Sequence, residues 1–156
     1  MITESIIILR LIVAAFLGAF IGFERERSHK AAGLRTHALT AMASALLAII
    51  TIYINQNFGL DSERYGFDSR ILANAIVGIG FIGGGAIIRF TDRVVGTTTA
   101  ASLFSVAAIG IATGLGMYFA SLTAALLAYL LLAVVGYFQR EIEKKDEPKI
   151  DIINHE

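Results

Sequence analysis

The sequence predicts an all-α membrane protein, a polytopic bundle of about five transmembrane helices. Of its 156 residues, 56% are hydrophobic and 17% are charged, whereas a soluble domain carries about 25% charged residues. The mean hydropathy is +0.69, and five apolar stretches approach the roughly 20 residues that cross a bilayer. The formal net charge is zero and cysteine is absent. The composition therefore indicates no nucleic-acid partner and excludes disulfides and thiolate metal sites.

The five apolar stretches are expected to span the membrane one after another. They are Ile6–Phe23, Thr36–Ile54, Ile71–Ile88, Thr98–Leu115 and Met117–Phe138. A soluble helical bundle is disfavoured because no stretch carries a charged face at helical spacing. Residues 1–138 are thus expected to form one membrane domain, and residues 139–156 a short cytoplasmic tail.

Basic residues are distributed unequally between the two sides that five spans define. Ten lie on the side that holds the gap between the first two spans, the gap between the third and fourth, and the C-terminal tail, and two lie on the other side. The ten are Arg25, Arg27, Lys30, Arg35, Arg89, Arg93, Arg140, Lys144, Lys145 and Lys149, and the two are Arg64 and Arg70. Because positive charge marks the cytoplasmic side, the chain is expected to run N-out and C-in.

Small residues recur at a spacing of four within the first, third and fourth spans. Lipid tails are as apolar as leucine, so spanning helices associate through close contact, which glycine permits. Helix-packing roles are expected for Gly18, Gly22, Gly78, Gly80, Gly83, Gly84, Gly110 and Gly114. The alternative is that glycine is simply common in membrane helices. Adjacent glycines weaken a helix, so a local break at Gly83–Gly85 is a second interpretation.

Arg10 lies about one turn inside the first span, where a charge is costly. One interpretation is that its side chain reaches out to the outer surface. The other is a buried ion pair with Asp68, the acidic residue nearest the outer end of the third span. Both interpretations remain open. Asn74, inside the third span, is expected to form a hydrogen bond with a neighbouring helix.

At the inner end, Glu24 is the charged residue most expected to face the bundle, because it follows the small-residue stripe that ends at Gly22. Arg35 opens the second span and Arg89 closes the third. Glu24 is therefore expected to accept charge-assisted hydrogen bonds from one of these two arginines.

Three threonines follow Gly96, at positions 97–99, and are expected to cap the fourth span. The amides of that helix end, beside the arginines, would also suit an anion.

Residues that carry enzymatic or metal chemistry are not found in a recognisable pattern. His29, His37 and His155 are scattered and are expected at or beyond the cytoplasmic surface. The sequence contains no H-E-x-x-H or G-x-S-x-G motif, and no acidic residue lies in the middle of a span. No catalytic residue, metal ligand or cofactor is therefore expected.

Four separated blocks resemble the MgtC/SapB family of bacterial inner-membrane proteins. They are RLIVAAFLGAFIGFERE, AGLRTH, DSRILANAIVGIGFIGGGAII and GTTTAASLFSVAAIGIATGLG. The family pattern has G-I-G-F-L-G-A-G where this chain has Gly78 to Gly85, and commonly a hydrophobic residue where Thr97 stands. Carried across, the pattern marks Arg10, Glu24, Arg35, Thr36, Asp68, Gly78, Gly80, Gly83, Thr98 and Thr99.

The resemblance implies a five-span domain with a cytoplasmic C-terminus in the bacterial inner membrane. It also implies a link to growth at low magnesium and, in some bacteria, to virulence. Longer family members are similar to this domain followed by a soluble domain, so a short form without it is expected here.

Two classes of function remain. The first is a non-enzymatic regulator that binds another membrane protein or a ligand, and the second is a transporter or channel for magnesium or another small ion. A homo-oligomer, a dimer by expectation, would use the flat faces of a small glycine-striped bundle.

Overall fold

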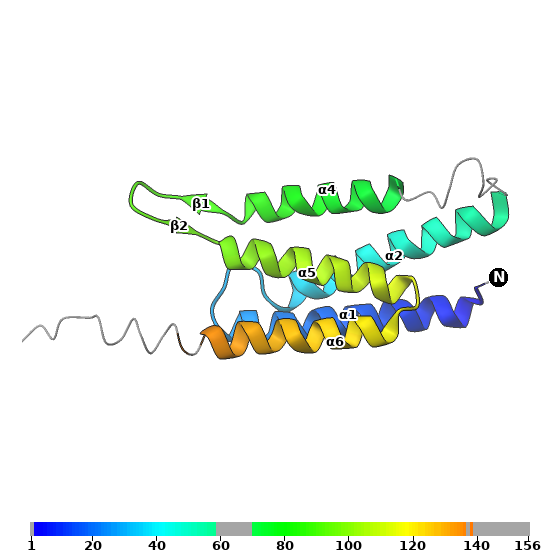
Figure 1. Cartoon of the computed structure of the whole chain (residues 1–156), viewed down its shortest axis with the longest axis horizontal. Helices are drawn as coiled ribbons and strands as arrows, with labels where there is room; N and C mark the ends of the chain where they lie inside the picture. The colour runs from blue at the N-terminus through cyan, green and yellow to red at the C-terminus, as the bar shows by residue number, and fades with distance from the viewer. Residues whose placement is uncertain (1, 59–69, 137, 139–156) are drawn as a thin grey trace, which may run out of the picture.

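The computed structural model describes residues 2–58, 70–136 and 138, which form an all-α bundle and confirm the predicted fold class. Five α-helices lie roughly parallel or antiparallel to one another (Figure 1). They are α1 (Glu4–Arg27), α2 (Leu34–Phe58), α4 (Arg70–Gly85), α5 (Thr97–Gly114) and α6 (Tyr118–Leu130). A small hairpin of β1 (Ile88–Arg89) and β2 (Val94–Val95) joins α4 to α5, and α6 continues as a π-helix, η1 (Leu131–Val135).

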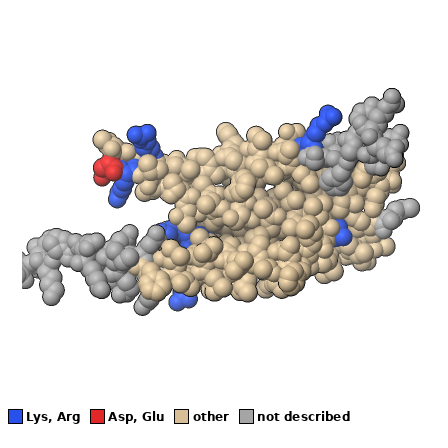
Figure 2. Space-filling model, viewed as in Figure 1, with Lys and Arg blue, Asp and Glu red and all other residues tan. Residues whose placement is uncertain are grey.

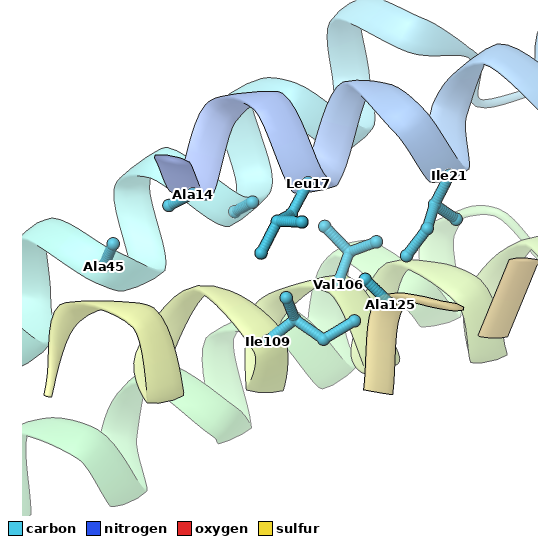
Figure 3. Close-up of a cluster of buried hydrophobic side chains, with 8 residues drawn as sticks. Ala14, Leu17, Ile21, Ala45, Val106, Ile109 and Ala125 are labelled. Carbon is cyan, nitrogen blue, oxygen red and sulfur yellow. The ribbon is translucent and has the colours of Figure 1, made fainter. Parts of the chain in front are cut away.

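The core lies where α1, α2, α5 and α6 meet. Its buried side chains are Ala14, Leu17 and Ile21 of α1, Ala41 and Ala45 of α2, Val106 and Ile109 of α5, and Ala125 of α6 (Figure 3). Half of these residues are alanines, whose short side chains allow the helix backbones to approach closely. The helix α4 lies outside this core and packs mainly against α5.

Four of the helices are long and apolar enough to cross a membrane, namely α1, α2, α5 and α6 with its π-helical extension. The helix α4 has 16 residues, which at about 1.5 Å per residue is shorter than a hydrocarbon layer of about 30 Å. The predicted third span is therefore wrong at its inner end, because the helix stops at Gly85 instead of Ile88. The glycine run explains this end, since the amides of Ala86 and Ile87 bond the carbonyls only three residues earlier, at 3.1 Å each.

The connection from α5 to α6 is a tight turn. Gly116 within it has a φ of +87°, a conformation that favours glycine because it has no Cβ. A second such position is Gly96, with φ +89°, immediately before α5. Side-chain capping by the threonines after it is a wrong prediction, because Gly96 itself occupies the cap position and no side chain caps the helix.

The α1–α2 loop, the β1–β2 hairpin and the end of α6 lie at the same end of the bundle (Figure 1). Figure 2 shows basic side chains near both ends of the visible face and an uncharged flank between them. We call the end with the hairpin the inner end, after the side on which the sequence places ten basic residues.

Candidate functional site

The inner end of α1 carries a buried ion pair. The Nε–H of Arg25 donates a hydrogen bond to the carboxylate of the adjacent Glu24, and both residues are less than a tenth exposed. The same carboxylate accepts a hydrogen bond from the hydroxyl of Ser28, with an O–O distance of 2.7 Å. The Arg25 guanidinium also lies 3.4 Å from the carbonyl oxygen of Leu132 in the π-helix. We call Glu24, Arg25 and Ser28 the inner cluster; it joins the end of α1 to the end of α6.

A cavity of about 500 Å³ adjoins the inner cluster. Besides the inner cluster, its polar lining consists of Arg27 at the end of α1, Lys30 in the loop that follows, and Thr98 in the first turn of α5. Its apolar lining comes from Phe23 and from the end of α6, including Tyr129 and most of η1. The site therefore combines a charged wall with an apolar one.

A second polar group is buried between α2 and α5. His37 is fully buried, with its Nδ1 2.8 Å from the carbonyl oxygen of Gly33 and its Nε2 3.0 Å from the hydroxyl of Ser102. A carbonyl oxygen can only accept, so Nδ1 carries a hydrogen. The Ser102 hydroxyl also lies 2.8 Å from the carbonyl oxygen of Thr99. The sequence places His37 at the cytoplasmic surface but does not predict its burial, which the small residue Gly22 allows: a Cβ added at Gly22 would lie 2.9 Å from the Cβ of His37.

Glu26 closes the loop between α1 and α2. Its carboxylate accepts a hydrogen bond from the backbone N–H of Leu34, the first residue of α2, with an N–O distance of 2.9 Å. A negative charge at this position also suits the positive end of the helix dipole. The charge-dense loop thus fixes where the second helix begins.

At the opposite end, Arg10 bridges α1 to the α5–α6 turn. Its Nη1 donates to the carbonyl oxygen of Gly114 at 2.6 Å, at the C-terminus of α5, where a cation is favoured. The guanidinium also occupies the space that a side chain at Gly116 would need. Asp68, the partner considered from the sequence, lies outside the described residues.

The other residues singled out in the sequence do not converge on one point. Arg35, Thr36, Arg89 and Thr98 are exposed, whereas Thr99 is buried at the start of α5. Glu24 forms its ion pair with Arg25, and not with the exposed Arg35 or Arg89. Asn74 is exposed on α4 and has no hydrogen bond to the described residues.

The glycines fall into two groups. At Gly18 and Gly22 of α1, and at Gly110 and Gly114 of α5, an added Cβ would come within 3.0 Å of atoms of α2 or of the loop before it. At Gly83 an added Cβ would meet only ordinary contacts with Ala100 of α5, the nearest at 3.5 Å. At Gly78, Gly80 and Gly84 of α4, nothing lies within 4 Å. The first group allows α1 and α5 to contact α2 directly.

Sequence reasoning missed the burial of Arg25, His37 and Ser102. One signal was available for the inner cluster, because Glu24 and Ser28 are four residues apart and so neighbours on a helix surface. Nothing in the sequence separates Arg25 from the equally charged Arg27. Among residues 2–58, 70–136 and 138, no three His, Cys, Asp or Glu side chains come together as a metal site.

Comparison with known proteins gives one family and several relatives. The sequence model of the MgtC family matches residues 11–141. "Putative magnesium transporter YhiD" of Escherichia coli K12 is 43% identical over 128 residues, which cover 81% of this chain and 59% of that protein. Protein SapB of Bacillus subtilis is 39% identical over 120 residues, which cover 74% of this chain and 52% of that protein.

Protein MgtC of Salmonella typhimurium LT2 is also 39% identical over 120 residues, covering 77% of this chain and 48% of that protein. The chain therefore spans about half to three-fifths of the length of these relatives. No solved structure matches it.

Proposed function

Because this chain belongs to the MgtC family, we propose that it is a non-catalytic protein of the bacterial inner membrane that acts by binding, under magnesium limitation. It is a bacterial membrane protein, with four helices long and apolar enough to span a bilayer. The link to magnesium is supported by the name of the YhiD relative. Binding is favoured over transport by the way the helices are packed.

The observation that carries the proposal is the close contact of α1 and α5 with α2. At Gly18 and Gly110 even one added carbon would collide with α2. Mg2+ gives up its water reluctantly and usually keeps several water ligands. A path for such an ion along these interfaces would need the helices to separate.

The buried hydroxyl groups support the same proposal. The side chains of Thr51, Thr113 and Ser121 each donate a hydrogen bond to a carbonyl four residues earlier in the same helix, at 2.8–2.9 Å. Bonds of this kind satisfy a hydroxyl in an apolar interior without a water-filled channel. These hydroxyl groups lie among the helices that also form the apolar cluster of the core.

Magnesium transport is the second candidate. It is favoured by the name of the YhiD relative and by the buried carboxylate of Glu24 beside the inner cavity. A carboxylate is the kind of ligand that Mg2+ takes from a protein. Against transport, Arg25 already pairs with this carboxylate, and Arg27 and Lys30 surround the same cavity.

The two candidates are separated by a flux measurement. The purified protein would be reconstituted into liposomes that contain a Mg2+-sensitive dye, and Mg2+ would be added outside. We expect entry at the rate of protein-free liposomes. A saturable influx that Glu24→Gln lowers, and that the exposed-site control Glu26→Gln leaves unchanged, would favour transport and overturn the proposal.

A cellular measurement gives the positive counterpart. In a strain that lacks its own family member and grows poorly at low magnesium, the chain is expected to restore growth without changing the rate of Mg2+ uptake. Restored growth accompanied by faster uptake would contradict a binding role.

A further inference from the structure

The described lining of the cavity at the inner end has an excess of positive charge. Among the residues that the structure describes, three basic side chains and one acidic side chain line it, those of Arg25, Arg27, Lys30 and Glu24. The Arg25 charge is balanced by Glu24, which leaves the charges of Arg27 and Lys30. Both of these residues are exposed, so their ammonium and guanidinium groups can reach a ligand without breaking the inner cluster.

The rest of the cavity lining is largely apolar. Leu131, Leu132 and Val135 of η1 line the cavity together with Phe23 at the end of α1. Phe23 is 55% exposed, at the point where the apolar part of α1 gives way to charged residues. The cavity therefore lies where a membrane interface would meet the protein, with one wall suited to a headgroup and the other to acyl chains.

The π-helical form of this wall is the second unusual feature. Most of η1 lines the cavity. Turns of π-helix are rare in proteins, and those that occur are often found at functional sites. The backbone carbonyl of Leu132 within η1 lies near the buried Arg25. The wall is thus held against the charged end of α1 and does not stand apart from it.

We infer that this cavity binds the phosphate group of an anionic phospholipid, with the headgroup at Arg27 and Lys30 and the acyl chain along the η1 wall. Basic pockets between helices on the cytoplasmic side are a known way to hold acidic lipid headgroups. A divalent cation is disfavoured by the surplus of positive charge. This inference is independent of whether the protein regulates or transports.

Free phosphate has the same chemistry as the headgroup but would make no use of the apolar wall. The arrangement of Phe23 and the η1 side chains therefore favours the lipid over the free ion. The two sources can be separated by competition.

The experiment uses a tryptophan in the cavity as the reporter. The chain has no tryptophan, and Tyr129 lines the cavity while stacking on Phe20 with ring centroids 4.5 Å apart, so Tyr129→Trp introduces a single indole there. This variant would be reconstituted in phosphatidylcholine vesicles that contain a minor fraction of lipid brominated on its acyl chains. That lipid is either phosphatidylglycerol or phosphatidylcholine. We expect brominated phosphatidylglycerol to quench the indole more strongly.

Two pairs of charge variants identify the source of the preference. Arg27→Gln and Lys30→Gln should each lower the relative affinity for phosphatidylglycerol by about fivefold. Arg89→Gln and Arg93→Gln are the matched controls, because they remove the same charge from exposed positions of the hairpin at the same end, and they should leave the preference unchanged. Equal loss in all four variants would indicate general attraction to the membrane and overturn the site.

Two further results would also overturn the inference. One is equal quenching by the two brominated lipids. The other is displacement of phosphatidylglycerol by millimolar inorganic phosphate, which would assign the cavity to free phosphate instead of a lipid.

Discussion

The carboxylate of Glu24 and the guanidinium of Arg25 have been taken out of water together. Removing a charged group from water costs several kcal/mol, and attraction between the two charges offsets that cost only while both are present. The hydroxyl of Ser28 adds a hydrogen bond to the same carboxylate. Each member of the inner cluster therefore depends on the others for its stability.

The first prediction follows from this dependence. Glu24→Gln should lower the free energy of unfolding in mild detergent by about 3 kcal/mol, because it strands the buried charge of Arg25. The double variant with Arg25→Gln should lose less than Glu24→Gln alone, since no uncompensated charge remains. Thermal unfolding followed by circular dichroism measures both.

Glu26→Gln serves as the control for the inner cluster. Glu26 is exposed and accepts the backbone N–H of Leu34, and the amide oxygen of glutamine can still accept that bond. The free energy of unfolding of the Glu26→Gln variant should change little. Equal losses for Glu24→Gln and Glu26→Gln would mean that the pair behaves like ordinary surface charges.

A second prediction concerns His37, whose ring is fully buried and bonded at both nitrogens. His37→Ala should destabilise the protein by about 2–3 kcal/mol, because it leaves a cavity and removes the partner of Ser102. His29→Asn is the comparison, since His29 is exposed with a φ of +52° that asparagine tolerates. A melting temperature that drops equally in both variants would argue against the buried role of His37.

At the scale of the helices, glycine has two different uses. Gly110 lies against the backbone of Ala41 in α2, whereas Gly80 on α4 has open space beside it. In the first position a side chain would push two helices apart. In the second it would only remove the flexibility that glycine gives to a helix.

The third prediction compares these two positions directly. Gly110→Ala should lower the melting temperature in detergent, because α5 can no longer approach α2. Gly80→Ala should leave it unchanged or raise it, with a gain of up to about 1 kcal/mol from helix propensity. Equal destabilisation by Gly80→Ala and Gly110→Ala would contradict the open space beside Gly80.

The helices could be predicted from the sequence because their apolar runs are long and contain few polar residues. The inner end of α4 could not be predicted as firmly, since Gly83–Gly85 is compatible both with a continued helix and with the observed stop. The composition of Leu131–Val135 does not distinguish the π-helical turn from an α-helix. Both differences depend on local backbone bonding rather than on hydrophobic pattern.

The candidate site was predictable in its location but not in its pairing. Glu24 is predicted to face the bundle because it follows a stripe of small residues at the inner end of the first span, and it is buried there. Its bond to Arg25 was not predicted, because four charges follow one another in the sequence and only packing decides which are buried. His37 was missed for the same reason.

At the scale of the whole molecule, the chain places its ends according to charge. The end of α1 with Arg25 and Arg27, the following loop with Lys30, and the hairpin with Arg89 and Arg93 lie at the same end of the bundle (Figure 1). An uncharged flank separates them from the opposite end (Figure 2). This arrangement is what the positive-inside rule requires of a protein whose inner end faces the cytoplasm.

The final prediction is that the inner end faces the cytoplasm, with the N-terminus outside. Alkaline phosphatase fused at Asn57, at the outer end of α2, should be active because it folds only outside the cytoplasm. Green fluorescent protein fused after Gln139 should fluoresce, because it folds inside. Phosphatase fused at Gly33, in the loop before α2, is the control and should be inactive. An inactive enzyme at Asn57 together with an active one at Gly33 would contradict this topology, because it would place the basic-rich end, with the cavity lined by Arg27 and Lys30, on the outer side.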